Sequence, residues 1–290
     1  MPNKKLKFIC GILAVLFLLN VLAWIAVYDF NQHRFLEVDF FDVGQGDPIF
    51  IETPEYHQIL IDGGSDSTVL EKLGKEMPFW DREIDLIILT HPEQDHLAGL
   101  IEILKRYKVE NILWTGVIRD TVEYKEWEKL IEKEKAQIFI VRAGQKIKAQ
   151  KLDSRILYPF ENLAGQILKD SNDTSVVTRL TFGENSFLFT GDVSRSAEKK
   201  FTENEINLDS DILKIAHHGS KTANSEDFIT KVSPRFAVIS VGKDNRYGHP
   251  NQEILDVLNK YGIKVLRTDR DGDIKIISDG KNYGISAIQN

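Results

Sequence analysis

The sequence predicts an α/β domain with two β-sheets covered by helices, preceded by one helix long enough to cross a membrane. Three observations support this fold class. Short apolar segments alternate with segments of helical spacing, predicted strands gather at both ends of residues 35–290, and the first thirty residues are strongly apolar. No repeat or low-complexity tract divides residues 35–290. We therefore expect a membrane anchor, residues 1–30, and one domain, residues 31–290.

The N-terminal segment has the length and the flanks of a transmembrane helix. Phe8 to Tyr28 is a run of 21 residues in which Asn20 is the only clearly polar side chain. A helix needs about this length to cross ~30 Å of hydrocarbon. Three lysines before the run, with Trp24 and Tyr28 at its far end, favour a single-pass helix in the cell membrane with a cytoplasmic N-terminus. The domain that follows would then be extracytoplasmic.

A cleaved signal peptide is the alternative for this segment. Val21 to Ala23 could serve a signal peptidase, and cleavage would release a secreted form of the domain. The length of the apolar run and its aromatic end favour the uncleaved anchor.

Composition and charge exclude several classes of protein. Cys10 is the one cysteine, so the chain can form neither an internal disulfide nor a cysteine-rich zinc site. The formal net charge is −7, and residues 35–290 alone carry 33 Lys and Arg against 43 Asp and Glu. Domains that bind nucleic acid non-specifically are usually basic. Any role on nucleic acid must therefore depend on local positive charge, such as that of a metal ion.

The order of predicted elements places polar residues after several apolar strands. The expected strands are 35–41, 48–52, 58–61, 85–90, 111–114, 137–141, 176–181, 186–189, 211–216 and 236–241. The expected helices are 68–77, 95–107, 122–134, 194–201 and 252–260, with Asn224 as the cap of one more.

Four groups that can bind a metal follow the strand 85–90. They are His91, Glu93, Asp95 and His96. Residues two apart on an extended segment face the same way, so His91 and Glu93 can point into one site, and the other two can turn inward from a helix start. Imidazoles with carboxylates suit zinc or manganese better than calcium. The alternative is a solvated loop in which Asp95 caps a helix.

Three further strand ends carry the same kinds of residue. Asp192 follows Gly191, His217 and His218 follow another strand, and His249 lies in the segment 247–250 after a third. Polar groups at the ends of core strands are expected to meet at one edge of a sheet, where α/β proteins bind ligands.

Seven short motifs are distributed over residues 42–250, which is most of the chain after the membrane segment. They are DVGQGD (42–47), IDGG (61–64), THPEQDHLAGL (90–100), SNDTSVV (171–177), FTGD (189–192), LKIAHHGS (213–220) and RYGHP (246–250). In this order they resemble the metallo-β-lactamase superfamily, and within it the extracytoplasmic nuclease-type domain of the ComEC family of DNA-uptake competence proteins.

The resemblance implies a four-layer αββα sandwich with one or two divalent metal ions, zinc or manganese, between the edges of its sheets. The residues that match ligand positions are His91, Asp95, His96, Asp192 and one of His217 or His218. Asp192 matches the metal-bridging position. Strand alternation would direct His217 and His218 to different sides, so that one binds metal and the other contacts substrate or a ligand.

Two departures from the superfamily pattern bear on the metal. Glu93 stands at the second position of the usual H-x-H-x-D-H signature and is itself a candidate ligand. No histidine lies between 96 and 217, and Asn172, Asp173 or Ser175 occupies that region. With fewer imidazoles and more carboxylates, the first metal site favours harder cations, so manganese competes with zinc. Occupancy by a single ion is also compatible with this set of ligands.

The resemblance also implies roles in hydrolysis by a metal-activated hydroxide. We expect Asp95 to orient the nucleophile, Ser220 to contact a phosphate oxygen, and His249 to stabilise the developing charge or protonate the leaving oxygen. The expected substrate-binding residues are Asn172, Ser175, Arg246 and His249. Asp42 and Asp62 are expected behind the ligands, with Asp62 orienting a histidine.

The expected function is therefore that of a membrane-anchored, extracytoplasmic phosphodiesterase or nuclease related to DNA-uptake competence proteins. Its expected partners are a phosphodiester such as DNA, the membrane, and a separate DNA channel protein, because this chain has a single membrane segment. One alternative is a hydrolase of small or cell-wall phosphoesters, similar to a phosphorylcholine esterase. Another is a non-catalytic binding protein that keeps the fold.

Overall fold

The computed structural model describes residues 4–30, 35–168 and 170–288 and divides the chain into two compact units, Met1–Arg34 and Phe35–Asn290. The first unit contains helix α1 (Lys4–Phe30), of which Lys4–Ile25 is long and apolar enough to span a membrane. The domain boundary expected at residue 31 falls outside the described residues.

The second unit contains two β-sheets. Sheet 1 has the order β15-β14-β1-β2-β3-β4-β5-β6, and sheet 2 has the order β13-β12-β11-β10-β9-β8-β7. Sheet 1 consists of β1 (Leu36–Phe40), β2 (Ile49–Glu52), β3 (Gln58–Ile61), β4 (Glu83–Ile88), β5 (Lys108–Trp114), β6 (Gln137–Ile140), β14 (Asp273–Ser278) and β15 (Tyr283–Ile288). Sheet 2 consists of β7 (Lys146–Ala149), β8 (Leu152–Tyr158), β9 (Val177–Phe182), β10 (Asn185–Phe189), β11 (Ile212–Lys214), β12 (Phe236–Ile239) and β13 (Lys264–Arg267).

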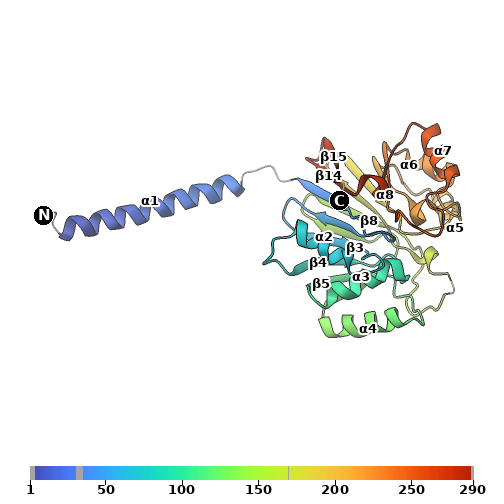
Figure 1. Ribbon diagram of the computed structural model, residues 1–290, viewed down its shortest axis with the longest axis horizontal. Helices are drawn as coiled ribbons and strands as arrows, with labels where there is room; N and C mark the ends of the chain where they lie inside the picture. Colours follow the sequence, from blue (N-terminus) through green and yellow to red (C-terminus); the bar gives the residue numbers. More distant parts are fainter. Residues whose placement is uncertain (1–3, 31–34, 169, 289–290) are drawn as a thin grey trace. The chain divides into compact units, whose positions relative to one another are not determined.

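Helices cover the outer face of each sheet (Figure 1). One apolar cluster joins sheet 1 to α2 (Thr68–Glu76), α3 (Gln94–Leu104) and α4 (Val122–Glu134). A second joins sheet 2 to α5 (Arg195–Glu203), α6 (Glu226–Val232) and α7 (Gln252–Lys260). A third cluster fills the space between the sheets, and α8 (Thr268–Asp271) precedes β14. The predicted four-layer αββα sandwich is confirmed.

Strand direction brings the functional segments to one end of the sandwich. In sheet 1, β3 to β6 run parallel, and in sheet 2, β10 to β13 run parallel. The carboxyl ends of parallel strands share an edge of a sheet, where α/β folds bind ligands. The 89–96 segment follows β4, the 190–192 segment follows β10, and the two adjacent histidines follow β11.

A cluster of buried charge lies under α2, away from that edge. Asp39 of β1 is paired in register with Lys275 of β14, whose Nζ lies 3.4 Å from Asp39, 3.0 Å from Glu37 and 2.5 Å from Glu76. Three carboxylates thus share one ammonium group. Burial raises the pKa of Asp39 to about 8, with the charge of Glu76 adding to the rise and Lys275 opposing it.

This cluster predicts a pH-dependent stability that Asp39→Asn should remove. The folded Asp39 binds its proton more tightly than an unfolded aspartate, so its contribution to stability is lost as pH rises from ~4 to ~8. The stability of the variant relative to wild type should increase by on the order of 1–3 kcal/mol between pH 5 and pH 8. Urea unfolding at both pH values measures this, with Asp209→Asn as an exposed control. A stability difference between variant and wild type that is the same at both pH values would contradict the assignment.

Candidate metal centre

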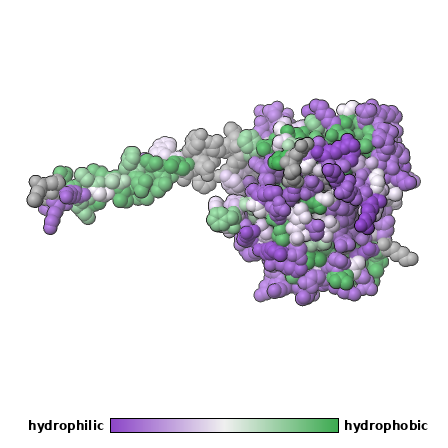
Figure 2. All heavy atoms as spheres, in the orientation of Figure 1, coloured by the Kyte–Doolittle hydropathy of each residue, from purple (hydrophilic) through white to green (hydrophobic). Residues whose placement is uncertain are grey.

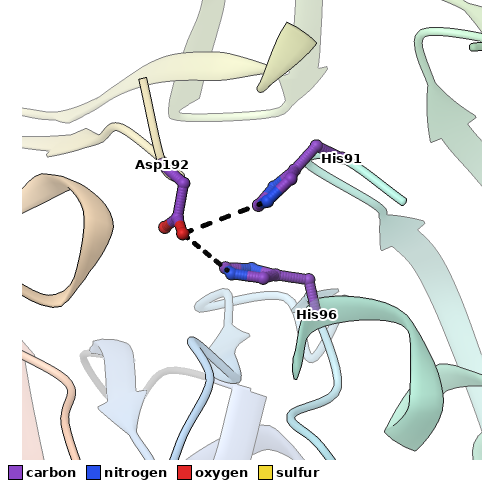
Figure 3. A group of neighbouring side chains, drawn as sticks. All are labelled: His91, His96 and Asp192. Carbon is purple, nitrogen blue, oxygen red and sulfur yellow. Dashed lines mark ion pairs between the residues drawn. The ribbon is translucent and has the colours of Figure 1, made fainter. Parts of the chain in front are cut away.

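A small polar hollow of about 180 Å³ lies at the strand ends described above. The residues that line it are Gln45, Glu93, Asp95, Asn172, Asp192, His217, His218, Tyr247 and His249. They come from the 44–47 turn, the start of α3, and the segments that follow β8, β10, β11 and β12. His91 and His96 lie buried at its floor and face Asp192 (Figure 3).

Hydrogen bonds fix the orientation of His91 and His96. The Thr90 hydroxyl donates to Asp62 Oδ2 at 2.7 Å, so it accepts from Nδ1–H of His91 at 3.0 Å. Nδ1–H of His96 donates to the same Asp62 carboxylate at 2.7 Å. Both rings therefore present an unprotonated Nε2 toward Asp192 when they are neutral. A histidine that binds metal is usually held in this way by an acceptor on its other nitrogen.

His218 is held in the same manner from the opposite sheet. Its Nδ1 lies 3.0 Å from the carbonyl oxygen of Ser240 and 3.1 Å from Asp47 Oδ1. Its Nε2 lies 3.3 Å from Asp95 and 3.7 Å from Asp192. Asp47 is in turn paired with the buried Lys214 at 2.7 Å. Three imidazoles, each held at Nδ1, thus place Nε2 within 4.0 Å of Asp192 Oδ2.

Asp192 lies at the centre of the cluster. Its Oδ2 is 3.4 Å from Nε2 of His96 and 4.0 Å from that of His91 and of His217. The main-chain N–H of Asp192 donates to Ser175 Oγ at 3.0 Å. Gly191 precedes it with φ +52°, and a Cβ there would lie 2.8 Å from the Ser175 side chain. Glycine at 191 therefore permits the turn that aims Asp192 into the hollow.

Close backbone approach places the helix that carries His96. Gly99 N–H donates to the Gly64 carbonyl, and a Cβ on Gly99 would lie 1.9 Å from the Gly63 carbonyl oxygen. The glycines of the 61–64 and 90–100 motifs thus let α3 press against the end of β3. Any larger residue at 99 would push His96 out of line with Asp62.

The cluster is strongly coupled electrostatically. Burial, reinforced by charge on His96, lowers the pKa of His91 to about 3. Burial also disfavours charge on His96 and His218, but neighbouring carboxylates outweigh it, raising the pKa of His96 and bringing that of His218 to about 10. Burial of Asp192 is outweighed by the charges of His96 and His218, so its pKa is lowered. The carboxylates therefore favour positive charge at this point, as a cation would supply.

The donor atoms fit a divalent metal. Nε2 of His91, Nε2 of His96 and Oδ1 of Asp192 are buried, with no hydrogen-bond partner among the residues that the structure describes. Buried polar atoms normally find partners, so these three require one. Among the described residues, three sets of donors could each hold an ion, because the donor atoms within each set lie within 4.8 Å of one another. They are His91–His96–Asp192, Asp95–His96–His218 and Asp47–Asp192–His218.

The structure brings most of the expected ligands together. It corrects the expectation that strand alternation directs His217 and His218 to different sides. His217 and His218 do not lie on a strand, because β11 ends at Lys214 and both adopt left-handed backbone conformations, with φ of 49° and 53°. Both rings therefore face Asp192 instead of opposite sides. His218 is buried and belongs to two of the donor sets, whereas His217 is partly exposed and contacts Asn172 and Thr222.

The helix cap expected at Asn224 is also corrected. Ser225 caps α6, whereas the Asn224 side chain bonds the N–H and the carbonyl of Ala216 at 2.9 Å each. Asn224 therefore holds the start of the turn that carries the two histidines.

Glu93 lies at the rim of the hollow and is outside the three donor sets. Its carboxylate is 2.8 Å from Arg119 Nη2 and accepts a hydrogen bond from Ser171 Oγ. Glu93 is the N-cap residue of α3 and keeps an extended backbone, but its carboxylate contacts Arg119 and Ser171 and is not part of a donor set with His91.

Four other expected site residues lie behind or beside the hollow. Ser175 Oγ bonds the backbone of Asp192 and of Asn172, so it positions Asp192 from behind. Ser220 Oγ is turned toward the Thr222 hydroxyl, at 2.9 Å. Arg246 is exposed and outside the lining, while its neighbour Tyr247 lines the hollow. Asp42 holds the glycine turn and the β14 segment by bonds to Gly44 and Asp273.

Sequence reasoning missed several residues of the centre. Asp47 and Lys214 support His218, and Thr90 fixes the His91 tautomer. Gln45 and Tyr247 line the hollow. All five residues lie within the seven motifs, so the motifs already pointed to their segments of the chain. Their type alone did not separate them from turn residues.

Glu93→Gln tests whether this carboxylate binds the metal. Since Glu93 is held by Arg119 and Ser171, we expect the variant to keep the wild-type amount of bound metal. His96→Ala should lose most of it, because it removes a donor from two sets. Elemental analysis of the purified proteins measures both. Metal loss in Glu93→Gln equal to that in His96→Ala would make Glu93 a ligand.

Fold and site together define a two-sheet sandwich with a cluster of histidines and aspartates, able to hold a metal ion, between its sheet edges. Residues 41–243 match the sequence model of the metallo-β-lactamase superfamily, which is more than half of the chain. The chain therefore belongs to the metallo-β-lactamase superfamily, whose fold is typically hydrolytic and binds divalent metals.

Two curated relatives are competence proteins, as the motifs predict. The chain is 33% identical to ComE operon protein 3 of Bacillus subtilis (strain 168), over 82% of this chain and 32% of that protein. It is 29% identical to competence protein ComA of Neisseria gonorrhoeae, also over 82% of this chain and 32% of that protein. The chain thus spans about a third of the length of these relatives. The metallo-β-lactamase fold protein YhfI of B. subtilis shares the fold, with a TM-score of 0.51, 15% identity, and coverage of 80% of this chain and 95% of that one.

Proposed function

We propose that this chain is a membrane-anchored, metal-dependent phosphodiesterase that acts outside the cytoplasm. DNA is the first substrate to test. One observation carries the proposal. Three imidazoles held at Nδ1 and the carboxylates of Asp95 and Asp192 meet at one hollow. Of their donor atoms, Nε2 of His91, Nε2 of His96 and Oδ1 of Asp192 are buried without a hydrogen-bond partner among the described residues. The lysines in the first turn of α1, before its apolar run, support a cytoplasmic N-terminus, which leaves the domain outside.

The residues proposed to hold the metal are His91, His96, Asp192, His218 and Asp95. Mixed nitrogen and oxygen donors without cysteine suit zinc or manganese, in one or two ions. When bound, a divalent ion lowers the pKa of coordinated water toward ~7 and polarises a phosphoryl oxygen.

The residues of the rim would bind and orient the substrate. Burial, with the charges of His218 and His217 adding to it, lowers the pKa of His249 to about 4. At neutral pH this imidazole is uncharged and can donate an N–H to an anionic oxygen. Asn172 lies 3.4 Å from His217 and offers an amide to the same oxygen. Asp95 is the carboxylate of the cluster with the greatest side-chain exposure, so it is placed to accept a proton from the nucleophile.

The resemblance of the seven motifs to DNA-uptake competence proteins supports DNA as the substrate class. Two curated relatives are described as a competence protein and a com operon protein, and both are about three times the length covered by this chain. We therefore propose a separate DNA channel protein as a partner. The net charge of −10 on residues 35–290 requires the metal to draw an anionic phosphodiester into the hollow.

Hydrolysis assays test this proposal. The full-length protein, purified in detergent, would be given Mn²⁺ or Zn²⁺ and assayed on single-stranded DNA, double-stranded DNA and bis-p-nitrophenyl phosphate. We expect cleavage of the small diester and of at least one DNA form, with His96→Ala inactive. Asp209→Asn, an exposed change at the opposite end of sheet 2, is the matched control.

Two outcomes would point elsewhere. Cleavage of p-nitrophenylphosphorylcholine without cleavage of DNA would assign the centre to small or cell-wall phosphoesters. Stoichiometric metal binding with no ester cleaved, or equal activity of wild type and His96→Ala, would leave a binding protein that keeps the fold.

A further inference from the structure

The domain exposes aromatic side chains at the end of sheet 1 that lies opposite the metal centre. The register of β1 to β4 places the start of β1, the 53–57 turn and the loop 78–82 at this end. β1 and β4 are three strand spacings of ~4.8 Å apart in sheet 1, so the group spans ~15 Å. We call Phe35, Tyr56, Phe79 and Trp80 the aromatic end of the domain.

Exposure at the aromatic end is unusual for large apolar side chains. Phe79 is 82% exposed and Trp80 is 73% exposed, while Tyr56 and Phe35 are each about half exposed. Phe79 and Trp80 contact each other edge to face, with ring centroids 4.9 Å apart. Figure 2 shows apolar surface projecting at the edge of the domain. An exposed aromatic pair of this kind marks a contact with a partner or a membrane.

The loop that carries this pair is held firmly in place. The Asp81 N–H donates to the Pro78 carbonyl at 2.9 Å, and the Asp81 carboxylate accepts from the Gln58 side chain at 2.8 Å. It also accepts from the Glu83 N–H at 3.1 Å. Met77, just before the loop, is buried in the core. The two rings are therefore presented by a fixed turn instead of a loose one.

Chain length limits how far this end of the domain can lie from the apolar span of α1. The apolar span ends at Ile25, α1 continues to Phe30, and β1 begins at Leu36. Five of the intervening steps are helical and rise 1.5 Å each, so the chain between the end of the span and the start of β1 can extend at most ~30 Å. The start of β1 is at the end of sheet 1 that carries the exposed rings.

We propose that the aromatic end rests in the lipid headgroup region, with Phe79 and Trp80 inserted, so that the metal centre faces away from the bilayer. Aromatic rings with a polar edge favour the membrane–water interface. Charge does not drive the contact, because acidic and basic residues alternate nearby at Asp81, Arg82 and Glu83. The proposal rests on insertion of α1 and is independent of the reaction at the metal centre.

Quenching of Trp80 by brominated lipids tests the proposal. The full chain would be reconstituted into phosphatidylcholine vesicles with bromine on shallow acyl positions. A Trp24→Phe background removes the tryptophan of α1, and Trp114 and Trp127 are buried in the domain core. The emission of Trp80 is the difference between this background and the same protein with Trp80→Phe. We expect bromine to reduce it about twofold or more, as for a tryptophan at the interface.

A tryptophan at the other end of the sheet is the matched control. Val122 is 80% exposed at the start of α4, three residues after Arg119, which reaches Glu93 at the metal centre. Val122→Trp, introduced together with Trp24→Phe and Trp80→Phe, should give the same tryptophan emission in brominated and in ordinary lipid. Equal quenching at both positions would overturn the proposed orientation.

Two further results would overturn the proposal. Unquenched Trp80 in vesicles that retain the protein after carbonate washing would mean that the rings contact a protein instead of lipid. Release of the protein by carbonate would remove the anchor and, with it, the proposed contact. Neither result bears on phosphodiester hydrolysis, which is measured in detergent.

Discussion

Asp192→Asn is expected to lower kcat/KM for a phosphodiester by more than ~100-fold and to remove most of the bound metal. Substitution of a residue that only supports a metal ligand typically lowers activity or metal affinity by ~10–100-fold. Asp192 Oδ2 lies within 4.0 Å of a ring nitrogen on each of four histidines, and Oδ1 is buried without a partner among the described residues. An amide keeps the volume but removes the negative charge that holds a cation there.

Asp62→Asn gives the comparison that separates a ligand from its support. Asp62 bonds Nδ1 of His96 and the Thr90 hydroxyl and belongs to none of the three donor sets. Its loss should weaken metal binding by ~10–100-fold while leaving activity recoverable at high metal concentration. Activity of each variant would be titrated against Mn²⁺ and Zn²⁺. If excess metal restores Asp192→Asn as fully as Asp62→Asn, Asp192 is not the central ligand.

Lys214→Met is expected to destabilise the domain by ~3–5 kcal/mol, the usual cost of removing one partner of a buried ion pair. Lys214 and Asp47 are almost fully buried, their charged atoms are 2.7 Å apart, and Lys214 also donates to the Ile215 carbonyl. Burial acts to raise the pKa of Asp47, but Lys214 and His218 outweigh it and keep the pKa low. Without the lysine, a buried carboxylate loses its main compensating charge.

Thermal unfolding measures this effect against a matched change. A loss of this size should lower the Tm by ~10 °C in a domain of this length. Lys199→Met removes an exposed lysine whose ion pair with Glu203 is 3.7 Å long, so it should cost less than ~1 kcal/mol. Equal Tm values for the two variants would show that the Lys214–Asp47 pair contributes little. The Lys214 variant should also bind metal less tightly, because Asp47 orients His218.

Much of the fold follows from local pattern. The strand expected at 85–90 is observed as Glu83–Ile88, and the helix expected at 95–107 is observed as Gln94–Leu104. Apolar runs of this kind are buried on both faces, which a parallel sheet with helices on one side and a second sheet on the other provides. The shared edge of parallel strands then brings residues of the 91–96, 192 and 217–218 segments together, as the sequence predicts.

Roles that depend on side-chain direction in turns could not be predicted. Period-two alternation holds only for extended segments, and His217 and His218 lie in a turn with positive φ. Glu93 precedes α3 with an extended backbone, and its carboxylate contacts Arg119 and Ser171, which come from distant segments of the chain. In both places the sequence contains the right residue type, but the tertiary structure decides its partner.

The sequence by itself determined the apolar helix, the alternation of strands and helices, and the strand ends that carry histidines and aspartates, because these depend on composition and on the period of local structure. The tertiary structure decided which atoms meet. The contacts of Asp47 with Lys214 and with His218 join the turn between β1 and β2 of sheet 1 to the end of β11 in sheet 2, more than 160 positions away. Such contacts depend on how the two sheets pack face to face, and no local period specifies that register.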